Sequence, residues 1–181
     1  MLISSDLNTA AGFKWPQDMI YPTSIISGAL SIMHPQLYED GIRGMSVLQD
    51  WSARYDSCMN QALALWPTTF TNISLIANWS TPLHCDPQSH ASWFDVLASV
   101  GEYTQCVMAI PTLGMELAYT PGTVVAFSGR PLWHGVNPVE GNRYCLSYYM
   151  RDNIHQWAKV PRCADWMRIH SVQELLRPTL L

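Results

Sequence analysis

Seven short runs of β-branched, aromatic and other apolar residues follow one another from residue 72 to residue 150. Turn formers such as Thr-Pro-Gly and Glu-Gly-Asn separate them. Short runs at this spacing are typical of a β sandwich or barrel, because each is too brief for a stable helix and ends at a chain reversal. The strands that we expect are 72–79, 93–100, 106–110, 115–119, 123–127, 132–136 and 143–150.

Helical periodicity precedes these runs. Apolar residues recur at steps of three and four from about Tyr38 to Leu65, which predicts one amphipathic helix. Residues 23–33 predict a shorter helix, and the polar, proline-containing residues 1–22 predict an extended lead-in. Helices followed by strands indicate an α+β fold, so we expect N-terminal helices packed on one face of a β core.

The length of 181 residues favours a single domain, and an apolar fraction of 48% supplies enough material for a core. We expect a helical part over about 1–66, a β core over about 70–151, and a C-terminal loop and helix over about 152–181. That last helix is expected at Ser171–Leu176, ahead of Pro178.

Charge and cysteine usage narrow the function classes. The net charge of −4 gives the whole chain no basic footprint for nucleic acid, although residues 143–181 carry six basic and three acidic side chains. That local excess indicates either a positive face or a solvated tail helix. No uncharged stretch is apolar enough to span a membrane, no secretory signal is visible, and the five cysteines form no C-x-x-C pair. We therefore expect an intracellular protein without a membrane partner.

His84 and Asp86 lie two residues apart, so in a strand both side chains point to the same side. His134 follows 48 residues after Asp86, in another β-rich run. Two histidines and one carboxylate form the facial triad of non-haem iron(II) oxygenases, which leaves three coordination positions open. Taken singly, each residue has a simpler interpretation as a surface, turn or rim residue, but their order and spacing favour a metal site.

Arg143 begins the next run, nine residues after His134. Its planar, permanently charged guanidinium suits the far carboxylate of a 2-oxo acid, although a strand-end surface arginine is the alternative. Ligands at the start and end of the strand-rich stretch fit a double-stranded β-helix, where both lie at one mouth of the barrel. Asn78 has two interpretations: it faces the pocket and binds cosubstrate or substrate, or backbone groups satisfy its amide.

Five blocks of the sequence carry a family resemblance: ANWSTPLHCD (77–86), WFDVLASVG (93–101), IPTLG (110–114), TPGTVVAFSGRPLWHGV (120–136) and GNRYCLSYYMRDNIH (141–155). The stretch that contains them resembles the TET/JBP branch of Fe(II)- and 2-oxoglutarate-dependent oxygenases, in particular its short fungal members. Weaker similarity runs upstream through AGFKWP, YPTSIISGAL and MHPQLY, so the resemblance covers most of the chain.

The resemblance implies a jelly-roll oxygenase with Fe(II) and 2-oxoglutarate as cofactors. Its iron ligands are matched by His84, Asp86 and His134, and its 2-oxoglutarate arginine is matched by Arg143. Cys145 stands where family members carry a small polar residue that helps to hold 2-oxoglutarate. A thiol forms weaker hydrogen bonds than a hydroxyl does.

On the substrate side, the resemblance matches Tyr149 to a ring that stacks on the target base and Arg151 to a residue that contacts the base edge. Ser89 stands where TET enzymes carry an asparagine that touches the base. The implied reaction uses O2 and 2-oxoglutarate to oxidise a methyl group on a DNA base, namely 5-methylcytosine, thymine or N6-methyladenine, in a nuclear protein. Two alternatives stay open: the same chemistry on a small molecule or protein side chain, and a non-catalytic family member.

Overall fold

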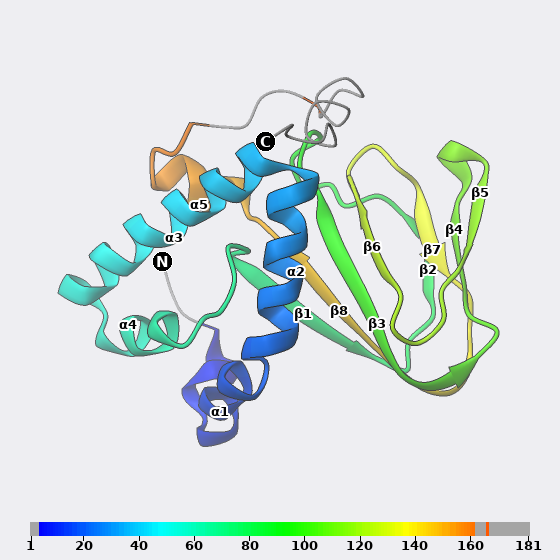
Figure 1. Cartoon of the computed structure of the whole chain (residues 1–181), viewed down its shortest axis with the longest axis horizontal. Helices are drawn as coiled ribbons and strands as arrows, with labels where there is room; N and C mark the ends of the chain where they lie inside the picture. Colours follow the sequence, from blue (N-terminus) through cyan, green and yellow to red (C-terminus); the bar gives the residue numbers. More distant parts are fainter. Residues whose placement is uncertain (1–3, 162–165, 167–181) are drawn as a thin grey trace, which may run out of the picture. The chain divides into compact units, whose positions relative to one another are not determined.

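A computed structural model of the chain describes residues 4–161 and Trp166, and the expected helix at Ser171–Leu176 lies outside these residues. Figure 1 shows helices together with antiparallel strands, which confirms the expected α+β class. The described residues fall into two compact units, one helical and one built from strands. The helical unit contains residues 4–69 and 153–161, and the β unit contains residues 70–152 and Trp166.

The helical unit consists of η1 (Ser5–Asn8), α1 (Ala10–Asp18), α2 (Ile20–Met33), α3 (Pro35–Tyr55), α4 (Ser57–Ala64) and all but the first residue of α5 (Asp152–Trp157). Because η1 and α1 are helical, the prediction of an extended lead-in over residues 1–22 is wrong. Thr9 begins α1 by accepting a hydrogen bond from the Gly12 N–H at 3.0 Å. Pro16 lies inside α1 and is buried, so packing offsets the helical hydrogen bond that it lacks.

The single amphipathic helix expected over 38–65 is two helices, α3 and α4, which meet at Asp56. The backbone of Asp56 is extended (φ −150°, ψ 91°), and its carboxylate accepts the Met59 N–H at 3.0 Å. A short acidic side chain therefore caps a new helix at a point where the apolar periodicity alone predicts continuation.

The β unit holds eight strands: β1 (Asn72–Ala77), β2 (Thr81–His84), β3 (Asp95–Thr104), β4 (Val107–Ile110), β5 (Met115–Ala118), β6 (Val124–Phe127), β7 (His134–Val136) and β8 (Glu140–Tyr149), with a short η2 (Pro111–Leu113) before β5. Each of the seven expected runs overlaps one of these strands, although β3 and β8 extend beyond theirs. The eighth strand, β2, escapes a pattern-based prediction because it is four residues long and contains Pro82, and a proline within a run argues against a strand.

The strands form two antiparallel sheets of four, in the orders β1-β8-β3-β6 and β2-β7-β4-β5. A buried apolar cluster draws side chains from both sheets and so fills the space between them. Its buried members come from β3, β4, β6 and β7 and from the segments that flank them, and they are Tyr103, Cys106, Met108, Ile110, Tyr119, Phe127 and Val136.

One face of β8 carries a row of side chains that includes three of the predicted site residues. Alternate residues of a strand share a face, so Arg143, Cys145, Ser147 and Tyr149 point to the same side. Ser147 and Tyr149 line a cavity there, and Arg143 and Cys145 contact Tyr119 of the core cluster. We call these four residues the β8 row.

Gly101 lies opposite Arg143 in the register of β3 and β8, at φ +124°, where a Cβ would collide with the carbonyl oxygen of Asn142. We expect Gly101→Ala to lower the free energy of unfolding by about 2 kcal/mol or more, because backbone strain adds to that collision. Gly28→Ala in α2 is the control, since nothing lies within 4 Å of its Cβ position. There the better helix propensity of alanine should raise stability by about 1 kcal/mol or less. Urea unfolding measures both changes, and equal effects would contradict the strain at Gly101.

Candidate functional site

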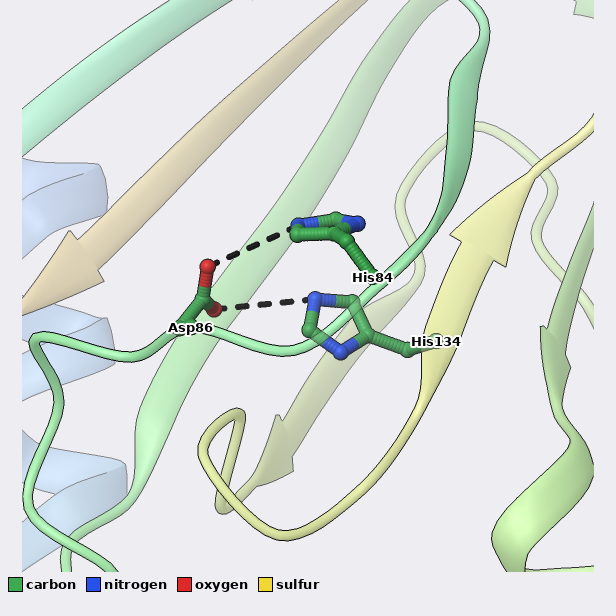
Figure 2. Close-up of side chains that lie close together, drawn as sticks. All are labelled: His84, Asp86 and His134. Atoms are coloured by element: carbon green, nitrogen blue, oxygen red, sulfur yellow. Dashed lines mark ion pairs between the residues drawn. The ribbon is translucent and has the colours of Figure 1, made fainter.

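Three of the predicted site residues converge at one point of the β unit. One ligand atom each from His84, Asp86 and His134 lies within 4.8 Å of the other two. Figure 2 shows the two imidazoles on neighbouring strands, both facing the carboxylate. The Nε2 atom of His84 is 3.5 Å from one carboxylate oxygen of Asp86, and the Nε2 atom of His134 is 3.6 Å from the other.

Strand pairing places the two histidines, and a loop places the aspartate. His84 ends β2 and is the register partner of His134 in β7, so their ring centroids are 4.3 Å apart. Asp86 lies beyond the end of β2 rather than on the strand, and its N–H donates to the carbonyl of Gly129 at 3.0 Å. A Cβ at Gly129 would collide with the Asp86 carboxylate. Strand alternation was expected to place the side chains of His84 and Asp86 on the same side. Instead, the absence of a side chain at Gly129 leaves room for the Asp86 carboxylate to lie beside the histidines.

Backbone carbonyls fix the tautomer of both imidazoles. The Nδ1 atom of His84 is 2.9 Å from the carbonyl of Pro82, and the Nδ1 atom of His134 is 2.9 Å from the carbonyl of Leu132. A carbonyl oxygen only accepts hydrogen bonds, so each neutral ring carries its proton on Nδ1 and keeps a lone pair on Nε2. Both Nε2 lone pairs point at the carboxylate, which is the arrangement that metal-binding histidines show.

The site is closed on one side and open on the other. His134 is 4% exposed and packs against the edge of Phe127 at 4.7 Å between ring centroids. Burial lowers the pKa of His134, so its imidazole is neutral near pH 7. The side chains of His84 and Asp86 are about 40% exposed. Two nitrogen lone pairs and one carboxylate thus face a shared point that solvent can reach, and this donor set fits a first-row divalent metal.

Arg143 is a buried cation in the same unit. It is 2% exposed, its Nε donates to the Ser99 hydroxyl at 3.2 Å, and its Nη1 donates to the carbonyl of Trp79 at 3.3 Å. Among the described residues, no carboxylate forms an ion pair with it. A buried charge without a partner is costly, so this guanidinium fits an anionic group of a ligand.

Asn78 and Cys145 lie next to Arg143 in different ways. The side-chain carbonyl of Asn78 accepts the backbone N–H of Arg143 at 2.8 Å. The backbone N–H of Asn78 donates to the backbone carbonyl of Arg143 at 2.7 Å. The amide oxygen of Asn78 is thus bonded to the backbone of β8, and its Nδ2 donates to the side-chain carbonyl of Asn142 at 3.3 Å. Cys145 is buried, and its sulfur lies 3.5 Å from the hydroxyl of Tyr119.

The three predicted substrate residues line or adjoin one cavity of about 340 Å³. The hydroxyl of Tyr149 lies 3.2 Å from that of Ser74, and the Arg151 guanidinium lies over the Tyr149 ring at 5.1 Å. Arg151 also donates to the side-chain carbonyl of Gln88. Asp86 belongs to the wall of this cavity. The cavity therefore shares a side chain with the three candidate metal ligands His84, Asp86 and His134, which we call the metal-site cluster.

Two further residues of this region were not predicted as site residues. Asp95 opens β3, is 3% exposed, and accepts the Ser89 hydroxyl at 3.0 Å in the cavity wall. Burial raises the pKa of Asp95 to about 7, against the hydrogen bond from Ser89. Tyr119 lies beneath Arg143, with 5.1 Å between the guanidinium carbon and the ring centroid. A buried aspartate at the first position of a strand is a weak signal in sequence, and nothing in sequence joins Tyr119 to Arg143.

Comparison with known proteins identifies the family. The family model Tet_JBP, described as the oxygenase domain of the 2OGFeDO superfamily, matches residues 16–152. The chain belongs to the Tet_JBP family. The prediction of a TET/JBP-type oxygenase is thereby confirmed, and membership implies Fe(II) and 2-oxoglutarate as cofactors.

A solved structure of NgTET1 in complex with 5mC DNA shares the fold, with a TM-score of 0.60 and 14% sequence identity. The match covers 95% of this chain but 62% of the NgTET1 chain, so this chain spans less than two thirds of that length. No curated protein matches the sequence. No helix among residues 4–161 is long and apolar enough to cross a membrane.

The metal-site cluster predicts one binding site for a divalent ion. We expect the protein to bind one equivalent of Mn(II) in calorimetric titration, and His84→Ala, Asp86→Ala and His134→Ala each to weaken binding by about 100-fold or more. Loss of a ligand should exceed the 10- to 100-fold effect of an outer-shell change. His90→Ala is the control, because His90 bonds to the Ser92 hydroxyl at 3.0 Å and lies outside the cluster. Wild-type affinity in Asp86→Ala would rule the cluster out as the site.

Asp95 predicts a pH dependence of stability in the protein freed of metal with chelator. Its folded-state pKa of about 7 lies above the unfolded value of 3.8, so between these values the folded state binds the extra proton. Its contribution to stability is therefore present below pH 4 and is lost as pH rises towards 7. Asp95→Asn should remove this decline in urea unfolding curves measured from pH 4 to 7. Glu116→Gln, at an exposed position of β5, should keep the wild-type slope. An unchanged slope in Asp95→Asn would show that other groups cause the decline.

Proposed function

We propose that this protein is an Fe(II)- and 2-oxoglutarate-dependent dioxygenase that oxidises a methyl group on a DNA base, namely 5-methylcytosine, thymine or N6-methyladenine. The observation that carries the proposal is the shared position of Asp86. It belongs both to the cluster with His84 and His134 and to the wall of the cavity that Tyr149 lines. A group bound in that cavity would lie next to the metal.

We also propose that the β unit is a double-stranded β-helix, or jelly roll. The support is the strand order, in which successive strands from β1 to β4 and from β5 to β8 are distributed between two four-stranded antiparallel sheets. The cluster at the β2–β7 pair then lies at the mouth of a closed β structure, as the resemblance implies. The whole chain would act as a single oxygenase domain.

Each predicted residue has a role that its surroundings support. His84, Asp86 and His134 would hold Fe(II) and leave coordination positions open on the exposed side. Arg143 would bind the C5 carboxylate of 2-oxoglutarate and thereby gain the anionic partner that it lacks. Bound Fe(II) and 2-oxoglutarate, with O2, supply the oxidising chemistry that hydroxylates a C–H bond and yields succinate and CO2.

The cavity sets limits on the substrate. A volume of about 340 Å³ is at the small end of ligand pockets, so it suits a single small group such as a base and would require that base to leave a duplex. The ring of Tyr149 offers a stacking surface, and Arg151 covers one of its two faces. A base would therefore stack on the other face or displace Arg151. Ser89, Asp95 and Gln88 supply donors and acceptors for the base edge.

The charge of the β unit favours a second candidate, the same oxidation of a small molecule or a protein side chain. Residues 70–152 contain six acidic and three basic side chains, and one of the three, Arg143, is buried. Arg130 and Arg151 remain for phosphate contacts, so affinity for duplex DNA should be low. DNA remains the first candidate because the family match and the fold shared with a TET protein support it, and a DNA substrate would imply a nuclear location. The assembled donor set argues against a non-catalytic member.

The test is mass spectrometry of oligonucleotides that contain 5-methylcytosine, thymine or N6-methyladenine, after incubation with the protein, Fe(II), 2-oxoglutarate and O2. We expect an added oxygen on at least one of the three bases, with succinate formed in step, and no product with Asp86→Ala. Succinate formation without base oxidation on single-stranded or duplex oligonucleotides would favour the second candidate. Absence of succinate under all conditions would favour a non-catalytic protein.

Tyr149→Ala separates the role of the ring from the chemistry. Stacking of a base on an aromatic ring is worth about 1–3 kcal/mol, so base oxidation should fall by about 5- to 150-fold. Uncoupled decarboxylation of 2-oxoglutarate should stay near the wild-type rate, because Arg143 and the metal ligands are unchanged. Unaltered base oxidation would remove the stacking role, and Tyr149→Phe, which keeps the ring, should retain most of the activity.

A further inference from the structure

The hydroxyl of Tyr119 lies close to the buried Arg143 and has no role in the proposed function. Tyr119 follows β5 and is fully buried, and its backbone is held at both ends. Its N–H donates to the carbonyl of Cys106 at 2.9 Å, and its carbonyl accepts the Tyr103 hydroxyl at 2.9 Å. The guanidinium of Arg143 lies 5.1 Å above its ring. The ring is therefore fixed in place beneath the cation.

This hydroxyl lacks a strong acceptor among the described residues. Its hydrogen-bond partner is the sulfur of Cys145 at 3.5 Å, and a thiol is a weak acceptor. Burial raises the pKa of Tyr119 above its usual value, and the neighbouring Cys145 adds to this effect. The hydroxyl therefore keeps its proton and is available as a donor. The Tyr119 hydroxyl and the Arg143 guanidinium therefore lie together beside Cys145.

We propose that Tyr119 supplies the hydroxyl that donates to the C5 carboxylate of 2-oxoglutarate beside Arg143, in place of the side chain at position 145. This inference rests on the proposed function. A carboxylate has two oxygens that accept several hydrogen bonds, and the guanidinium alone leaves part of that capacity unused. Family members carry a small polar residue at the position of Cys145. The thiol of Cys145 is poorly suited to a hydrogen bond with the carboxylate. Tyr119 reaches the same point from the opposite sheet and so restores the donor.

The test measures binding of 2-oxoglutarate to the full chain loaded with Ni(II), which allows binding without turnover. We expect Tyr119→Phe to weaken binding by about 10-fold, the usual effect of losing a hydrogen bond to a charged group. Cys145→Ala should change the affinity by less than about 3-fold on the same argument. Adding Cys145→Ser to Tyr119→Phe should recover most of the loss, because the new hydroxyl replaces a sulfur that lies 3.5 Å from the Tyr119 hydroxyl.

A second ligand separates loss of this bond from damage to the site. 2-Oxopentanoate has the chain of 2-oxoglutarate but a methyl group in place of the C5 carboxylate, so its affinity should be the same for wild type and Tyr119→Phe. Equal weakening of both ligands would overturn the proposal in favour of a structural role. Tyr148→Phe is the matched control, since Tyr148 is also fully buried but lies on the other face of β8. It should keep the wild-type affinity for 2-oxoglutarate.

The remaining outcomes distinguish this inference from the proposed function. If Cys145→Ala weakens binding of 2-oxoglutarate by 10-fold and Tyr119→Phe does not, Cys145 holds the carboxylate and the inference is wrong. If the Ni(II)-loaded wild type does not bind 2-oxoglutarate, or Arg143→Ala binds it equally well, the proposed function fails at its cosubstrate. A wild type that binds and a Tyr119→Phe variant that binds as tightly would overturn the role of Tyr119 alone.

Discussion

Three groups that can bind a metal ion through lone pairs face one another at the centre of the site. Carbonyl groups hold the imidazole protons of His84 and His134 on Nδ1, so both Nε2 lone pairs point at the Asp86 carboxylate at 3.5–3.6 Å. Such a set is unfavourable until a cation joins it. The pairing of β2 with β7 and the absence of a side chain at Gly129 maintain this geometry, so the local fold serves to hold like groups together.

Arg143 is also unfavourable where it lies, because it is a buried positive charge without an anionic partner among the described residues. It is a buried cation whose described partners are a hydroxyl and a carbonyl, so its charge is solvated but not neutralised. Ser99 is itself held by the Tyr103 hydroxyl at 2.7 Å, which fixes the guanidinium before any ligand arrives. A ligand that carries an anionic group at one end and metal-binding oxygens at the other would relieve both unfavourable features. The candidate metal site and Arg143 together therefore fit a 2-oxo acid with a second carboxylate, which is the chemistry of the family cosubstrate.

Local pattern in the sequence was sufficient for seven of the eight strands and for the family, and it selected the three residues that the structure brings together at the candidate metal site. It was insufficient where the surroundings of a residue depend on tertiary contacts. The seven expected runs overlap strands because alternation and turn formers are local signals. Pro16 and Asp56 were misread because a buried proline and a helix cap depend on surroundings that periodicity does not contain. Asp95 and Tyr119 were missed because burial and the contacts with Ser89 and Arg143 single them out, and these features exist only in the folded structure. The roles of the substrate residues remain proposals, because the cavity constrains size and polarity more than it selects a base.

The β8 row places Arg143, proposed to bind the cosubstrate, and Tyr149, proposed to stack on the base, on one uninterrupted strand. Side chains alternate along a strand, so inserting or deleting one residue between Arg143 and Tyr149 would turn one of them away from the interior. Length changes in this segment are therefore incompatible with keeping both proposed roles. Substrate preference in such a protein can diversify by exchanging side chains such as Ser147 in place, or by altering the loop that carries Gln88 and Ser89. The spacing of Arg143 and Tyr149 along β8 therefore has to stay constant while other positions of the site change.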